Sequence, residues 1–453
     1  MQDYLSLSRT LTRRDALWLG GAAIGAAALA PGLAACGDDD GGGAGGQRQI
    51  QFLSTQLAPI EEAEKFRNEI LGEFEGSVRF VGDDNPATFA DRVIAQERAG
   101  QVSISLLGGL HPHLEILAAR NLLADLSDLG QELSGRGFNK DFLELGRFGG
   151  DRLLFIPWMQ ATYIMAARRE ALEHLPGGAN VNSLTYDQWR EWGASIASDE
   201  GSPRLGFPVA DDGLIHRFFE GYSYPSYTGA LNSAFTSSGA VAMWDWMGGT
   251  WQQTNPQSTT YAFMEEPLLS GEVWVAWDHT ARLINAFTTD PDSFVAFPAA
   301  RGPEGLGYMP VVAGLAIPKG APNAKGAREL ISYLTRPETA ATTLRAVAFL
   351  PPFERQEEVA ADVDPGIRAE VDAVQAMYGS RDVIPALSPV GLGEQEEAYN
   401  QVFRTTFEQI VLDRRDVGTT LDEQAGSLQE VLDAAKARCW RPDAASTGTC
   451  QVA

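Results

Sequence analysis

The stretch GLAIPKGAPN, residues 314–323, follows the order of a strand, a turn and the start of a helix. Apolar residues at 313–317 predict the strand, and the Pro and Gly residues that follow predict the turn. Beyond Pro322, apolar positions recur at helical spacing over 325–335. This unit therefore has the sequence pattern of an α/β protein.

The same alternation occurs three times closer to the N-terminus. Residues 49–54, 77–81 and 102–107 predict strands, and each is followed by a helical pattern. Such an order predicts a mainly parallel sheet with helices on both faces. In sheets of this kind the ligand crevice lies beyond the carboxyl ends of the strands.

The composition is that of a globular protein. Of the 453 residues, 44% are hydrophobic and 21% charged, and the length predicts two or three domains. The 35 Lys and Arg and 60 Asp and Glu residues give a formal net charge of −25. Because phosphate binding needs a basic face and no run of Lys and Arg occurs, we expect no nucleic-acid partner.

Residues 1–35 predict an export signal, which has to be set aside before the fold is considered. Three Arg precede an apolar stretch that is rich in Gly and Ala. Residues 12–17, TRRDAL, resemble the twin-arginine export motif, although Thr12 and Ala16 replace the Ser and Phe that are usual there. The general export route is the alternative.

The apolar stretch ends at residues 33–36, LAAC, which resemble a bacterial lipobox. The resemblance implies cleavage before Cys36 and acylation of its sulfur. The alternative is a transmembrane anchor, but a membrane span needs about 20 apolar residues and this stretch is short and broken by Gly. The rest of residues 36–46, rich in Asp and Gly, predicts a flexible linker to the folded part.

The chain has three cysteines, Cys36, Cys439 and Cys450. With Cys36 acylated, the other two form a plausible disulfide in an oxidising compartment. Spacing alone does not show that their sulfurs meet.

Three stretches, in this order, resemble the extracellular solute-binding proteins of family 1, which are of the maltose-binding type. The first is Gly108-Gly109 with residues 122–127, LLADLS. The second is residues 268–273, LLSGEV, although Trp274-Val275 replaces the family's Ala-Met. The third and most specific is the block at 314–323 followed by a helix and by residues 335–338, TRPE.

The resemblance implies an α/β periplasmic-binding fold of type II, with two lobes joined by a hinge and closing over a solute. By analogy, the first lobe comprises 47–160 and 280–335, and the second comprises 161–279 and 336–453. It also implies a substrate-binding lipoprotein of an ABC importer, which captures a carbohydrate and delivers it to the permease. We expect a monomer held by Cys36 at the outer face of the cytoplasmic membrane, with no enzymatic activity, cofactor or metal.

A sugar presents hydroxyls around its edge and apolar C–H faces, so its receptor needs aromatic rings together with carboxylates, amides or guanidinium groups. Candidates at predicted strand ends, at the first lobe crossing and in an aromatic loop are Gln56, Asp83, Asp84, Gly109, Trp158, Gln160, Tyr163, Tyr222, Tyr224, Trp277, Asp278 and His279. For the aromatic candidates the alternative is core packing. For the polar residues after the first two strands, the alternative is that they form solvated turns without contacting a ligand.

Other functions remain open at this stage. The sequence has no Gly-x-Ser-x-Gly, phosphate-loop or His-Glu-x-x-His motif, and His111-Pro112-His113 lacks a nearby third metal ligand. The many carboxylates leave an anchored carbohydrate-active hydrolase or lyase as one alternative. A ligand sensor and a binding protein for a non-sugar solute are the others.

Overall fold

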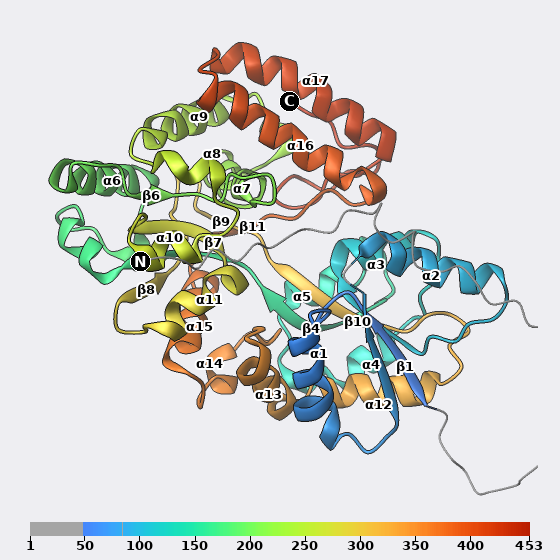
Figure 1. Cartoon of the computed structure of the whole chain (residues 1–453). Coiled ribbons are helices and arrows are strands. Elements are labelled where there is room, and N and C mark those ends of the chain that lie inside the picture. Colours follow the sequence, from blue (N-terminus) through green and yellow to red (C-terminus); the bar gives the residue numbers. More distant parts are fainter. Residues whose placement is uncertain (1–48, 84) are drawn as a thin grey trace, which may run out of the picture. The chain divides into compact units, whose positions relative to one another are not determined.

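The computed structural model describes residues 49–83 and 85–453 (Figure 1). The predicted export signal 1–35, the linker 36–46 with Cys36, and Asp84 lie outside the described residues. Within the described ranges, no helix is both long and apolar enough to cross a membrane. The chain is organised around two larger β-sheets, which form the centres of two lobes.

The first sheet has the strand order β2–β1–β3–β10–β4. β1 (Ile50–Ser54) pairs in parallel with β2 (Val78–Gly82) and with β3 (Leu106–Leu110). β10 (Val311–Ala316) lies antiparallel between β3 and β4 (Ile156–Ala161). All strands except β10 therefore run in one direction, which confirms the mainly parallel sheet predicted from the sequence.

The third strand forms later in the chain than its predicted range of 102–107. It includes Gly108 and Gly109, which the pattern had placed after the strand. A Cβ at Gly108 would lie 2.9 Å from the Ser54 hydroxyl and 3.0 Å from a ring carbon of Trp158. The position therefore requires Gly for close packing inside the sheet, and not for a turn.

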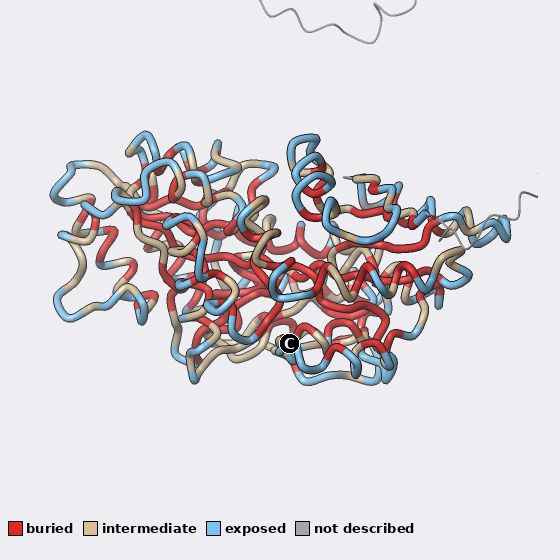
Figure 2. Tube along the Cα trace, turned by 90° about the horizontal axis from the view of Figure 1, so that it is seen from below, coloured by how far each residue is buried: buried red, intermediate tan, exposed pale blue. Residues whose placement is uncertain are grey.

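Side chains of the first sheet alternate between two apolar cores. Phe52 and Leu106 face one core, whereas Leu53 and Leu107, one residue later, face the other. Figure 2 shows buried chain running through the inside of the molecule and exposed chain at its outer turns. The helices of this lobe are α1 (Ile60–Lys65), the π-helix η2 (Phe66–Ile70), η3 (Leu71–Glu73), α2 (Pro86–Arg98), α3 (His111–Ala119), α4 (Ser127–Glu132), η4 (Ser134–Arg136), α5 (Lys140–Leu145) and α12 (Ala324–Leu334).

The second sheet has the strand order β6–β7–β5–β8. β5 (Tyr163–Arg168) lies antiparallel to both β7 (Val275–His279) and β8 (Phe294–Phe297), and the short β6 (Leu205–Gly206) is parallel to β7. Residues 163, 165 and 167 of β5 face one core and residues 164 and 166 face the other. The second lobe is thus also a sheet with an apolar core on each face.

Helices and one small sheet surround this second sheet (Figure 1). The small sheet pairs β9 (Leu306–Tyr308) in parallel with β11 (Val383–Pro385). The helices are η5 (Arg169–His174), η6 (Val181–Ser183), α6 (Tyr186–Glu200), α7 (Ile215–Phe218), the π-helix η7 (Phe219–Ser223), α8 (Tyr224–Thr228), η8 (Asn232–Ala234), α9 (Ser238–Trp251), η9 (Pro256–Thr260), α10 (Glu265–Ser270), α11 (Thr280–Thr289), α13 (Pro337–Val347), α14 (Gln356–Val359), α15 (Pro365–Tyr378), η10 (Gly393–Gln395), α16 (Glu396–Phe407), the π-helix η11 (Glu408–Leu412) and α17 (Val417–Ala435).

The chain passes between the lobes at neighbouring points. Thr162 separates β4 from β5, and Met309-Pro310 separates β9 from β10. The Thr162 hydroxyl donates a hydrogen bond of 2.9 Å to the Met309 carbonyl, so these two crossings are tied together. A third passage runs along α13, where Ala340 joins a core of the first lobe and Leu344 joins a core of the second.

The sheets correct the predicted lobe boundaries at one place. Residues 280–335 were assigned to the first lobe, but β8 pairs with β5 and α11 packs into a core of the second sheet. The return to the first sheet comes only at β10. The order of elements along a chain does not state which sheet a strand joins, so this part of the prediction rested on analogy alone. The other boundaries remain predictions.

The predicted disulfide between Cys439 and Cys450 is present, with the two Cα atoms 4.5 Å apart. It closes a short loop after α17. The Cys450 N–H also donates to the Ala437 carbonyl at 2.8 Å. The C-terminal segment is thereby fixed to the end of α17.

Candidate functional site

A cavity of about 370 Å³ lies where the two sheets meet. The first lobe contributes residues 110–113, at the junction of β3 and α3. The second lobe contributes Tyr163, Arg217 and His279, and the crossing segment 309–312 passes between them. Both lobes therefore supply walls of one cavity.

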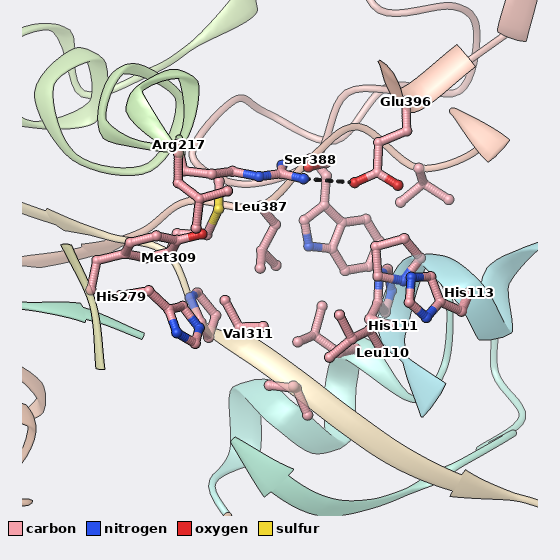
Figure 3. A pocket seen from close by; sticks show the side chains of 18 of the residues that line it. Leu110, His111, His113, Arg217, His279, Met309, Val311, Leu387, Ser388 and Glu396 are labelled. Carbon is pink, nitrogen blue, oxygen red and sulfur yellow. Dashed lines mark hydrogen bonds and ion pairs between the residues drawn. The ribbon is translucent and has the colours of Figure 1, made fainter. Parts of the chain in front are cut away.

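Further walls come from segments remote in sequence. These are residues 387, 388 and 390, the beginning of α16 at Glu396, and Trp440 inside the disulfide loop. Figure 3 shows Arg217, Ser388 and Glu396 along one side of the cavity, with Val311 and Leu110 on the opposite side.

Arg217 is the centre of the charged side. Its guanidinium donates to Glu220 at 2.8 Å and to Glu396 at 2.9 Å, and Glu220 is fully buried beside it. Burial alone would lower the pKa of Arg217, but the two carboxylates outweigh burial and raise it above the usual value. Arg217 therefore stays charged, and its charge is already balanced within the protein.

Three histidines line the cavity and are held neutral. Burial lowers the pKa of His111 to about 4 and that of His279 to about 3, and it also lowers the pKa of His113, which Glu396 partly offsets. At neutral pH each ring thus offers one N–H donor and one acceptor nitrogen. These groups form hydrogen bonds without adding charge.

The orientation of His279 follows from its position at the start of α11. Its Nδ1 accepts a hydrogen bond of 3.2 Å from the Ala281 N–H, which caps the helix. Because Nδ1 accepts, the proton of the neutral ring is on Nε2. Nε2 is therefore a hydrogen-bond donor.

Two of the predicted ligand-binding residues, Tyr163 and His279, line the cavity. They lie directly opposite each other on β5 and β7. The Tyr163 ring stacks on Trp277 with ring centres 4.8 Å apart and an interplanar angle of 4°. Trp277 itself is fully buried and lies behind Tyr163, so it supports the wall instead of forming it.

Asp278, between Trp277 and His279, is also not a cavity residue. It is fully buried on the opposite face of β7, where its carboxylate accepts from the Met264 N–H at 2.9 Å and from the His279 N–H at 2.7 Å. Burial raises the pKa of Asp278 to about 7, against the opposing effect of Arg282. The alternation of a strand places neighbours on opposite faces.

Trp158 and Gln160, predicted at the first crossing, are buried in β4 and do not line the cavity. Trp158 packs against the rings of Phe52 and Phe66 in a core of the first lobe. The amide oxygen of Gln160 accepts from the Tyr378 hydroxyl at 2.8 Å. Core packing, the alternative considered for Trp158, is what the structure shows.

Tyr222 and Tyr224, from the predicted aromatic loop, lie in helices and are fully buried. The Tyr222 hydroxyl lies 2.9 Å from the Thr162 hydroxyl and therefore helps to fix the crossing. The Tyr224 hydroxyl donates to the Phe235 carbonyl at 3.2 Å and accepts from the Trp244 indole at 3.0 Å. Both tyrosines are structural in this arrangement.

The remaining described candidates lie at strand ends but outside the cavity lining. The Gln56 amide contacts the hydroxyl of neighbouring Thr55. Asp83 pairs with Arg92 at 3.2 Å, near the start of α2. Gly109 is buried inside β3, one residue before the cavity wall begins.

Several cavity residues were not among the sequence predictions. Arg217 and Glu396 are 179 positions apart, so no local pattern connects them. Trp440 was not predicted either, and His111-Pro112-His113 was considered only as an incomplete metal site. Pro112 stands at the start of α3, a position that proline favours, and this places the two histidines at the cavity. No group of three or more potential metal ligands occurs in the part of the chain that the structure describes.

The sequence matches the family model described as bacterial extracellular solute-binding protein over residues 71–341, more than half of the chain. The chain belongs to this family. The match confirms the family resemblance found in the sequence. Proteins of this family bind solutes and work outside the cytoplasm. Comparison with curated proteins finds no match.

Solved structures of solute-binding proteins share the fold. Maltose-bound MalE3 of T. maritima superposes with a TM-score of 0.65 at 17% identity, covering 85% of this chain and 100% of the other. UgpB from Mycobacterium tuberculosis in complex with glycerophosphocholine superposes with a TM-score of 0.66 at 19% identity. The match covers 86% of this chain and 99% of UgpB. MalE from Xanthomonas citri superposes with a TM-score of 0.68 at 14% identity, and the match covers 85% of this chain and 98% of that protein. These similarities confirm the predicted two-lobe α/β fold.

Proposed function

We propose that this solute-binding protein captures a carbohydrate and delivers it to the permease of an ABC importer. One observation carries the proposal: a single cavity is walled by both lobes, with hydrogen-bonding groups set around apolar surfaces. Sugars require this combination because their hydroxyl edges and C–H faces must both be contacted. Similar folds were solved with maltose and with acarbose, which supports the same class of ligand.

The proposed mechanism is closure of the two lobes. Residues 110–113 of the first lobe and Tyr163 and His279 of the second line the same cavity, so a ligand between them gains both sets of contacts only when the lobes are together. The tied crossings at Thr162 and Met309 are the hinge in this mechanism. The closed form presents the surface that the permease recognises. No covalent step is needed.

Isothermal titration calorimetry with glucose, galactose, mannose, maltose and trehalose tests the carbohydrate assignment. Glycerophosphocholine, a tetrapeptide and spermidine serve as non-sugar comparisons. We expect at least one sugar to bind with a heat that saturates at one ligand per protein. Binding of a non-sugar compound with no response to any sugar would contradict the assignment.

The same samples test the alternative of a hydrolase or lyase. We propose that the protein is not an enzyme, because its family consists of binding proteins. Oligosaccharides recovered after prolonged incubation are therefore expected to be unchanged by mass spectrometry. Any shortened product that depends on the protein would contradict this.

The proposal places the protein at the outer face of the cytoplasmic membrane, as a monomer exported through the signal at 1–35 and held by lipid on Cys36. The support is the sequence alone: a twin-arginine-like motif, a lipobox and a Gly-rich linker at 36–46. Replacement of Cys36 by Ala is expected to move the protein from the membrane fraction to the soluble fraction. Mass spectrometry of the N-terminal peptide would show the lipid directly.

A further inference from the structure

The cavity is lined mostly by apolar side chains, and this restricts the chemical class of ligand that it can bind. Ten of the nineteen residues that line it are Leu, Val, Met or Pro, including the crossing segment 309–312 and residues from both lobes. Among the described residues of its lining, only Tyr163 and Trp440 supply large aromatic rings. Aliphatic walls favour an apolar group, because they offer no hydrogen bonds and no ring on which a sugar face can stack.

Free hydrogen-bond acceptors are scarce in the same cavity. Its described lining residues include one carboxylate, Glu396, and no Asp, Asn or Gln. Of the three lining histidines, His113 already engages Thr55 through Nδ1, and His279 accepts from the Ala281 N–H. Glu396 already accepts from Arg217 at 2.9 Å. An oligosaccharide with hydroxyls along its whole length would leave many of them without an acceptor, and each buried unsatisfied donor carries an energetic cost. The cavity therefore suits a ligand that is polar over only part of its surface.

The charged pair and the aliphatic wall face each other across the cavity. Arg217, Ser388 and Glu396 lie along one side, and Leu110 and Val311 lie opposite them, with the neutral rings of His111, His113 and His279 beside these aliphatic groups (Figure 3). A ligand with a polar end and an apolar end satisfies both sides at once.

We propose that the ligand is an amphipathic glycoside: a single sugar unit beside Arg217, Ser388 and Glu396, joined to an apolar group that contacts Leu110, Val311 and Leu387. This inference rests on the proposed function and narrows its substrate class. Half-buried Leu387 lies between the two sides in Figure 3 and forms part of the apolar contact.

Calorimetry with matched methyl and phenyl β-glycosides of glucose, galactose and mannose tests the inference. For at least one sugar, we expect the phenyl glycoside to bind about tenfold more tightly than the methyl glycoside, because the ring removes apolar surface from water. Leu387→Asn is expected to reduce this ratio to about threefold or less while the methyl glycoside still binds. Val311→Thr, a nearly isosteric change at another half-buried wall position, should act in the same direction.

Leu269→Asn is the matched control. It makes the same change on α10, at an exposed side chain outside the cavity lining, and should leave the ratio unchanged. Equal affinities for methyl and phenyl glycosides, or a ratio that both cavity variants leave intact, would overturn the inference and leave the carbohydrate assignment standing. Failure of every sugar and glycoside to bind would overturn both.

Discussion

His279 caps a helix and lines the cavity with the same side chain. Its Nδ1 caps α11, and this hydrogen bond fixes the proton on Nε2 of a ring that lines the cavity. The edge of the ring also packs against Tyr163, with centres 5.0 Å apart. The hydrogen bond that caps α11 thus determines which ring nitrogen of His279 carries the proton in the cavity wall.

Two substitutions separate these roles. His279→Ala removes the cap and the ring, and should lower the free energy of unfolding by about 1 kcal/mol. His279→Asn retains a good capping residue and should cost less than about half of that. Both should weaken ligand binding by about tenfold, because each removes the Nε2 donor. Urea unfolding and calorimetry measure the two effects. Wild-type affinity in His279→Asn would contradict the binding role.

Glu115 provides a second test at the level of a single side chain. It is buried on α3, and its carboxylate accepts from the Gly391 N–H at 2.7 Å. Burial raises the pKa of Glu115 from 4.5 to about 7. The bond from Gly391 and the charge of Arg438 oppose this rise, and Glu396 adds to it. Because the folded-state pKa is above the unfolded one, this stabilising contribution is complete below pH 4.5 and is lost as the pH rises through about 7.

Glu115→Gln keeps an acceptor for Gly391 and removes the titration. Between about pH 5 and pH 8, the free energy of unfolding of wild type should fall more than that of the variant, by on the order of 2 kcal/mol. Urea unfolding of both proteins across this range measures the difference. Parallel pH profiles would show that Glu115 titrates alike in the folded and unfolded chains.

At the level of elements, Asp443 joins the C-terminal segment to η8. The buried carboxylate accepts from the backbone N–H groups of Leu231, Asn232 and Ser233 at 3.0–3.1 Å, and from side chains of the last two. Asp443→Ala would leave these donors without their acceptor, among them the groups of buried Leu231 and Asn232, so the free energy of unfolding should fall by about 3 kcal/mol. Asp128→Ala, at an exposed ion pair with Arg328, is the matched control and should cost less than about 1 kcal/mol.

The disulfide is the other connection of this segment. Replacing Cys439 and Cys450 by Ala opens a short loop, and should reduce the free energy of unfolding by about 2–3 kcal/mol. Because Trp440 in this loop lines the cavity, ligand affinity should fall as well. Thermal unfolding with and without ligand measures both. Unchanged affinity would mean that the loop keeps its shape without the bond.

The sequence predicted elements better than it predicted the site. β1 and β2 formed within a residue of their predicted ranges, because alternation and flanking turns are local signals. Tyr163, predicted as a ligand contact at the first crossing, and His279, predicted after a strand, both line the cavity, and their contact with ligand stays a prediction. Trp277 was also predicted as a ligand contact, but it is buried behind Tyr163. A Trp near a strand end gives the same sequence pattern whether its ring lines a cavity or packs behind a residue that does. Arg217 and Glu396 are far apart in sequence and come together only through the tertiary fold, so no sequence pattern predicts this pair.

At the scale of the whole molecule, the proposed function depends on closure of the two lobes. The lobes share the neighbouring crossings at Thr162 and Met309, and the cavity lies beside these crossings with walls from both sheets. A ligand there contributes contacts that hold the lobes together, whereas the free protein gains nothing comparable from closure.

We therefore expect saturating ligand to lower the radius of gyration measured by small-angle X-ray scattering. At about 100 times its Kd, the ligand should also raise the free energy of unfolding by about 2.7 kcal/mol. His279→Asn at the same ligand concentration should show smaller changes in both, because it binds more weakly. If ligand raises the stability of wild type while the scattering curve does not change, binding occurs without closure, and the permease must recognise the bound state by another feature.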